Sequence, residues 1–115
     1  MSKDFATQLV AFVEGVQEKS NAYFAEHLSN LVPDLYQIEG GKKYIKISKA
    51  DNGGNGSKSV HSFIVSVDDP KKGQKMGDVL KPASWKAPAK HARGNIFSDK
   101  NGLEAVDNHG WVRYL

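Results

Sequence analysis

The sequence contains no cysteine, which excludes a disulfide framework, a thiolate metal site and a cysteine nucleophile. It also lacks any stretch approaching the roughly 20 apolar residues that a membrane-spanning helix requires. Its first residues, Met-Ser-Lys-Asp-Phe, do not form the uninterrupted apolar run of a secretory signal peptide. We therefore expect a cytoplasmic protein with no membrane partner.

Signals of catalysis are equally sparse. The sequence has four isolated histidines with no two at metal-ligand spacing: His27, His61, His91 and His109. Asp68 and Asp69 stand where a strand gives way to a turn, which does not favour hydrolysis by paired carboxylates. Ser84 and His91 show neither a nucleophile elbow nor an oriented triad. We expect no metal and no cofactor, and no residue is assigned a catalytic role, so an enzyme is unsupported.

Charge is unevenly distributed along the 115 residues, although the net charge is only +3. Residues 1–34 carry two lysines against five acidic residues, a net charge of −3. Residues 70–95 carry six lysines and one arginine against Asp78 alone, a net charge of +6. This asymmetry indicates an anionic partner for the middle of the chain and a different contact for its start. The alternative is a solvated lysine face that only keeps the protein soluble.

The N-terminal part shows the periodicity of one helical face. The apolar positions are Phe5, Leu9, Phe12, Val13 and Val16, and the same phase continues through Ser20, Tyr23, Phe24, His27 and Leu31. Ser2 or Asp4 can cap the helix, and Pro33 should end it near Asn30. We expect one long helix; a two-helix hairpin broken at Gly15 or at residues 20–21 is the alternative. The stripe should pack on a sheet, although a homo-oligomer through this helix or a partner groove also fits it.

Four strands and a C-terminal fifth follow the helix. Alternating or apolar runs predict strands over residues 35–39, 43–48, 60–67, 76–80 and 111–115, with Gly40-Gly41 as a hairpin turn and residues 51–57 as a flexible loop. In the third run, His61, Phe63 and Val65 should share one face. The predicted fold is α+β: a long N-terminal helix packed on a meandering antiparallel sheet of four or five strands. A single domain spans residues 1–115, with a helical segment (1–32) and a β-rich segment (35–115).

The basic block, residues 71–97, is the candidate working surface. It sets a tryptophan between two prolines among cations, and we expect it to form a fixed loop with a short helix over residues 89–93 that ends at Gly94. The candidate nucleic-acid or phosphate-binding residues are Lys81, Trp85, Lys86, Lys90, His91, Arg93 and Gly94. Trp85 can stack on a base or pack in the core, Arg93 can contact a phosphate in bidentate fashion, and the lysines should point outward.

The block from residue 77 to residue 97 reads GDVLKPASWKAPAKHARGNIF, preceded by SVHSFIV at residues 59–65 and followed by VRYL at the end. Over these segments, which make up less than half of the chain, it resembles a group of small proteins encoded by tailed bacteriophages, most without an assigned function. The resemblance implies a phage protein that acts in the host cytoplasm or is packed in the virion. It supplies no catalytic residues.

Two classes of function follow. The first is a small accessory binding protein that engages nucleic acid or a phosphorylated nucleotide through the basic block. The second is a protein-interaction module that binds or inhibits a host protein through its acidic helix and basic face.

Overall fold

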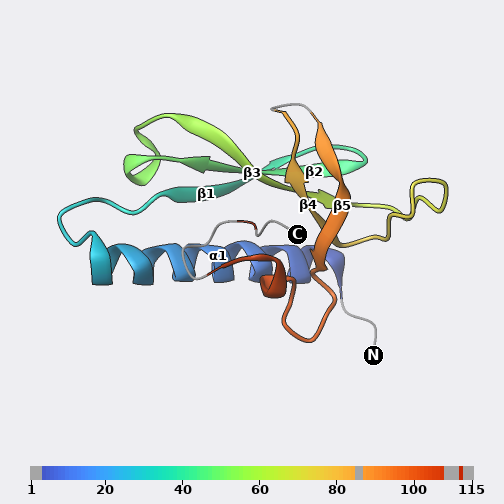
Figure 1. The fold of residues 1–115 in the computed structure, drawn as a ribbon, viewed down its shortest axis with the longest axis horizontal. Coiled ribbons are helices and arrows are strands. Elements are labelled where there is room, and N and C mark those ends of the chain that lie inside the picture. The colour runs from blue at the N-terminus through green and yellow to red at the C-terminus, as the bar shows by residue number, and fades with distance from the viewer. Residues whose placement is uncertain (1–3, 85–86, 108–111, 113–115) are drawn as a thin grey trace.

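One long helix lies against one face of a five-stranded antiparallel sheet in the computed structural model, which describes residues 4–84, 87–107 and 112 (Figure 1). The elements are α1 (Phe5–His27), β1 (Leu35–Gly40), β2 (Tyr44–Ala50), β3 (Lys58–Val65), β4 (Asp78–Pro82) and β5 (Pro88–Asn95), with short 3-10 helices at Asn52–Gly54 and Leu103–Ala105. The strands lie side by side in the order β1-β2-β3-β4-β5. The α+β fold predicted from the sequence is therefore confirmed.

The helix is continuous, as predicted. Asp4 caps its start by accepting a hydrogen bond from the Thr7 backbone N–H at 3.1 Å. Gly15 does not break it: a Cβ atom here would lie 2.8 Å from Leu103 Cδ1, so this glycine lets the segment after β5 approach the helix. Figure 1 shows that segment running beside α1. The helix ends at His27, one turn earlier than predicted.

The core lies between the helix and the sheet. Its members come from α1, from the sheet and from the C-terminal segment: Leu9, Phe12, Val13, Val16, Tyr36, Ile47, Ile64, Val79, Ile96, Ala105 and Val106. The predicted apolar stripe is buried from Leu9 to Ser20, whereas His27 and Leu31 are exposed. The stripe therefore packs on the sheet of its own chain, the first of the three predicted uses of that face.

A bulge in β3 overturns one prediction about side-chain direction. Ile47 pairs with Ser62 and Ser48 with Val60, which leaves His61 as the extra residue. His61 faces the helix, where its ring lies 6.5 Å from that of Phe12 and 5.2 Å from that of Tyr36. The prediction that His61 shares a face with Phe63 is wrong, because one inserted residue reverses the alternation.

The predicted short helix over residues 89–93 is also wrong. Residues 88–95 form β5, whose pairing with β4 includes Leu80 opposite Ala92 and Val79 opposite Gly94. Val79 and Leu80 are fully buried, so the backbone groups of β4 need hydrogen-bond partners that water cannot supply. Pairing with β5 satisfies them, and this tertiary requirement outweighs the local helix preference of an Ala- and Lys-containing segment.

The predicted C-terminal strand falls mostly outside the described residues, but Val112 is buried and bridges Val106. Within the described part of the chain, α1 and the shorter helices are either too short or too polar to cross a bilayer.

Candidate functional site

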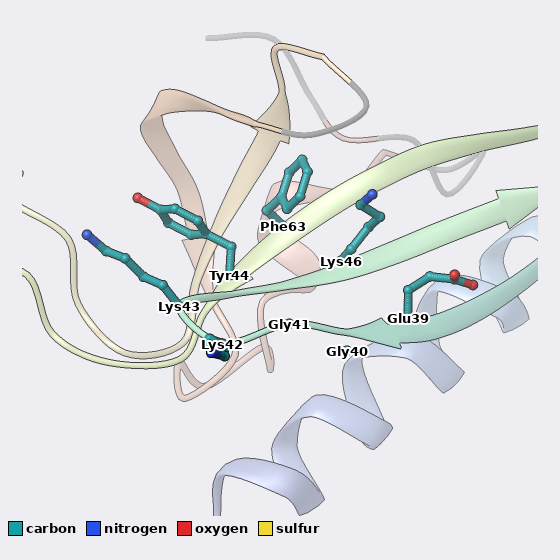
Figure 2. A pocket seen from close by; sticks show the side chains of 8 residues that line it. All are labelled: Glu39, Gly40, Gly41, Lys42, Lys43, Tyr44, Lys46 and Phe63. Carbon is teal, nitrogen blue, oxygen red and sulfur yellow. The ribbon is translucent and has the colours of Figure 1, made fainter.

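The face of the sheet opposite the helix carries an open hollow of about 590 Å³, which we call the lysine hollow (Figure 2). Its lining is Glu39, Gly40, Gly41, Lys42, Lys43, Tyr44, Lys46 and Phe63. These residues come from the end of β1, the β1–β2 turn, β2 and β3. Figure 2 shows Tyr44, Lys46 and Phe63 rising from the sheet on the side away from α1.

Strand alternation and a tight turn build this hollow. Tyr44 and Lys46 are two residues apart on β2 and so point to the same face, opposite Val65 and Phe63 of β3. The turn that brings the neighbouring lysines to this edge depends on Gly41, whose φ is +138°. A Cβ atom at Gly41 would lie 2.0 Å from the Tyr44 carbonyl oxygen, so no other residue fits without moving the turn.

The Tyr44 ring is held in place from three directions. Its hydroxyl donates a hydrogen bond to Gln74 Oε1 at 3.0 Å, and Gln74 is itself buried. Its ring meets that of Phe63 edge to face, with centroids 6.4 Å apart. The Lys43 Nζ lies 5.5 Å from the ring centroid. Tyr44 remains half-buried, so part of a fixed aromatic surface is accessible to a ligand.

The carboxylates near the lysine hollow are engaged with lysines. Glu39 accepts hydrogen bonds from Lys58 Nζ at 2.8 Å and Ser48 Oγ at 2.9 Å, and these bonds lower the pKa of Glu39. Asp69 pairs with Lys43; the hydrogen bond lowers the pKa of Asp69 and raises the pKa of Lys43. Glu39, Asp69 and Lys43 are therefore charged at neutral pH.

A second hollow, of about 480 Å³, adjoins Tyr44 and is called here the proline hollow. It is lined by Tyr44, Lys72, Gln74, Ala87, Pro88 and Ala89. Tyr44 is thus a wall shared by the two hollows. Around both, five lysines stand against two carboxylates, a formal excess of three positive charges: Lys42, Lys43, Lys46, Lys58 and Lys72 against Glu39 and Asp69.

The structure places the described candidate residues that were predicted from the sequence on one hairpin, formed by β4 and β5. Lys81 is half-buried at the end of β4, and Lys90 lies within β5. His91 is exposed on β5. Trp85 and Lys86 fall outside the described residues. The basic block therefore contributes the hairpin of β4 and β5 rather than a loop and helix that encircle one site.

Arg93 and Gly94 differ most from the prediction. Arg93 is half-buried, and its Nε and Nη1 atoms are buried without a hydrogen-bond partner in the described part of the chain. These two nitrogens are therefore not available to a ligand in this conformation. Gly94 faces the C-terminal segment, where a Cβ atom would lie 2.8 Å from Glu104 Oε2. A side chain at this position would clash with Glu104, so the close packing of these two segments requires glycine here.

The sequence interpretation missed the lysine hollow because it weighed net charge over long segments. The signal was the run Lys42-Lys43-Tyr44-Ile45-Lys46, in which an aromatic ring and cations share one strand face. The contribution of Lys72 and Gln74 could not be found this way, because only the tertiary fold brings their turn beside Tyr44.

The chemistry available here is anion binding. Lysines supply charge and hydrogen-bond donors for phosphate, and the tyrosine and proline supply apolar surface. No group of three histidine, aspartate or glutamate side chains suited to a metal ion occurs in residues 4–84, 87–107 and 112.

Comparison with known proteins assigns the chain to a family but not to an activity. No curated protein and no solved structure matches it. One family profile matches residues 3–115, nearly the whole sequence. The chain therefore belongs to a family of unknown function, DUF7717.

Proposed function

We propose that this protein is a small accessory binding protein that engages nucleic acid or a phosphorylated nucleotide through the lysine hollow. The observation that carries the proposal is the combination, in one concave surface, of Lys42, Lys46 and the fixed ring of Tyr44. The hollow lies within the roughly 300–1,000 Å³ typical of ligand sites. The surrounding excess of positive charge would draw a phosphate-bearing partner to it.

The proposed contact surface is the lysine hollow and not the basic block predicted from the sequence, but the proposed chemistry, binding of phosphate by cations, is the same. The basic block still contributes, because Lys72 and Pro88 line the neighbouring proline hollow. The resemblance to tailed-phage proteins adds the proposal that the protein works in the cytoplasm of an infected bacterium. Among the described residues that line the two hollows, none is a nucleophile beside a base, so the proposed role is binding without a reaction.

A second candidate function is that of a protein-interaction module. A shallow, largely apolar hollow on the outer face of α1 is lined by Ala6, Thr7, Val10, Ala11 and Glu14, and Val10 is 45% exposed. A host protein could seat an apolar side chain there. The test of this candidate is a stoichiometric, nuclease-insensitive pull-down that Val10→Asp abolishes.

The nucleic-acid proposal is tested by titrating labelled oligonucleotides at several salt concentrations. Replacing Lys42 and Lys46 together by alanine should weaken binding at least tenfold at about 0.1 M salt, because two cations that face phosphate are lost. It should also reduce the slope of log K against log salt by about 1.4 for a single strand or about 1.8 for a duplex.

The matched control replaces Lys19 and Lys100, which lie on α1 and in the turn that packs beside it, on the other layer of the molecule. The control removes the same charge and should leave both affinity and slope within about a factor of two. Equal losses in the two double variants would mean that net charge alone acts, and absence of salt-dependent binding by the unaltered protein would refute the proposal.

A further inference from the structure

The arrangement of the two hollows indicates which kind of phosphate-bearing ligand the protein binds. We infer that the protein binds an unpaired nucleic-acid strand, which crosses the Tyr44 ring from the lysine hollow into the proline hollow. This inference rests on the proposed function and adds the form of the ligand and the residue that selects it.

The lysine hollow and the proline hollow are continuous. Tyr44 lines both hollows, so the two hollows adjoin at its side chain. At about 590 and 480 Å³, each is large enough for a nucleotide-sized group. A lone mononucleotide would use only one compartment, whereas a strand occupies both.

Lysine side chains line both hollows. Lys42 and Lys46 line the first hollow and Lys72 lines the second, so both of the hollows that meet at Tyr44 carry cations. The nearest acidic groups, Glu39 and Asp69, are paired with Lys58 and Lys43. A backbone with regularly spaced phosphates matches cations that are separated by an aromatic surface.

The surface between these lysines is apolar, and a duplex would not use it. In a duplex the base faces are stacked on one another, and a protein reaches only phosphates, sugars and groove edges. Here the middle of the path is an aromatic ring, followed by Pro88 and Ala89. Such a surface suits bases that are unstacked and turned toward the protein.

The Tyr44 ring is held in one position before any ligand binds. Gln74 is fixed by a tight turn, in which Asp69 and Gln74 exchange backbone hydrogen bonds of 2.8 and 2.9 Å. It accepts from the Tyr44 hydroxyl, while Phe63 meets the ring from the side, as Figure 2 shows. A ring held in this way loses little conformational freedom when a base stacks on it.

The test compares one labelled oligonucleotide of about 12 nucleotides, within the site sizes of small single-strand modules, with its own duplex. The single strand should bind at least tenfold more tightly than the duplex. Tyr44→Leu should weaken single-strand binding about tenfold and leave the salt slope unchanged, because it removes stacking and no charge. Tyr44→Phe should stay within about threefold of the unaltered protein. Tyr23→Leu, on α1, is the matched control and should change nothing.

A second measurement does not depend on the stability of the variants. The unaltered protein is irradiated with the same strand carrying 5-iodouracil, and the adduct is mapped by mass spectrometry. Cross-linking at Tyr44 supports the inference, and cross-links confined to other segments overturn it.

The remaining outcomes separate the inference from the proposed function. If duplex and single strand bind equally, with salt dependence through Lys42 and Lys46 and no effect of Tyr44→Leu, the proposed function stands and the inference fails. If a nucleoside monophosphate competes as strongly as the strand, one hollow is the whole site and the inference fails again. If neither the two nucleic acids nor a nucleoside monophosphate binds in a salt-dependent way, both fail.

Discussion

Phe12 provides the most direct test of how this fold is held together. It has no exposed surface, and it packs where the helix meets both the sheet and the C-terminal segment. The His61 ring lies 6.5 Å away, and a Cβ atom at Gly102 would lie 3.1 Å from Phe12 Cδ1. Contacts on both sides leave little room for the site to collapse after truncation. We therefore expect Phe12→Ala to cost about 3–5 kcal/mol of unfolding free energy.

That cost is large for this chain and easy to measure. At about 2.1 cal/mol/K of unfolding entropy per residue, a loss of about 4 kcal/mol lowers the melting temperature of 115 residues by roughly 15–20 °C. Urea denaturation followed by circular dichroism gives the free energy independently. Val10→Ala is the control, because Val10 is 45% exposed on the same helix and its loss should change stability by no more than about 0.5 kcal/mol. A loss below about 1 kcal/mol for Phe12→Ala, or a change of oligomeric state in sedimentation without a loss of stability, would refute this account of the core.

Three further predictions concern buried polar groups and the loop between β2 and β3. Burial raises the pKa of Tyr36 to about 12 from its usual 10, so part of the folding free energy should be lost as the pH rises from 10 to 12, and Tyr36→Phe should remove that part in alkaline unfolding curves. Burial opposes ionisation of Glu104, but hydrogen bonds from the Asn95 N–H and the Ser98 hydroxyl outweigh it and lower the pKa of Glu104 below its usual 4.5. The carboxylate's contribution is therefore present above pH 4.5 and lost as the pH falls through the lower folded value; Glu104→Gln should cost about 1–2 kcal/mol at pH 7 and progressively less in acid, measured by urea denaturation. Replacing residues 52–57 with an Asn-Gly turn should preserve the fold at a cost of about 1–2 kcal/mol in thermal unfolding, because the Gly53 N–H donates to the Pro33 carbonyl at 2.9 Å; a loss of the native circular dichroism spectrum would contradict this.

Local patterns were sufficient wherever one period of hydrophobicity persisted without interruption. The α1 stripe and the alternation in β2 each specify a face from near neighbours in the sequence. Gly40-Gly41 marked a turn that the structure has, because a chain reversal with positive φ favours glycine at these positions. The helix, the order of the first four strands and the antiparallel arrangement could therefore be predicted from the residues.

Local patterns failed where pairing partners decided the outcome. Residues 89–93 have side chains compatible with a helix, yet β4 recruits them as a strand because its buried backbone needs partners. His61 follows an alternating pattern, yet a bulge opposite Ile47 and Ser48 turns it toward the helix. In both places the deciding atoms belong to the neighbouring strand, and the local pattern of side chains carries no sign of them.

Local patterns also predict one part of the candidate site and miss another part. The sequence by itself determined a cation-rich chain with Lys42, Tyr44 and Lys46 close together, because strand alternation is a local property. Only the tertiary structure brought the turn with Lys72 and Gln74, and the start of β5 with Pro88, next to Tyr44. It also buried two guanidinium nitrogens of Arg93 and packed Gly94 against Glu104. A binding surface made of three separate chain segments depends on how the sheet pairs and twists, which is fixed by the packing of the whole chain.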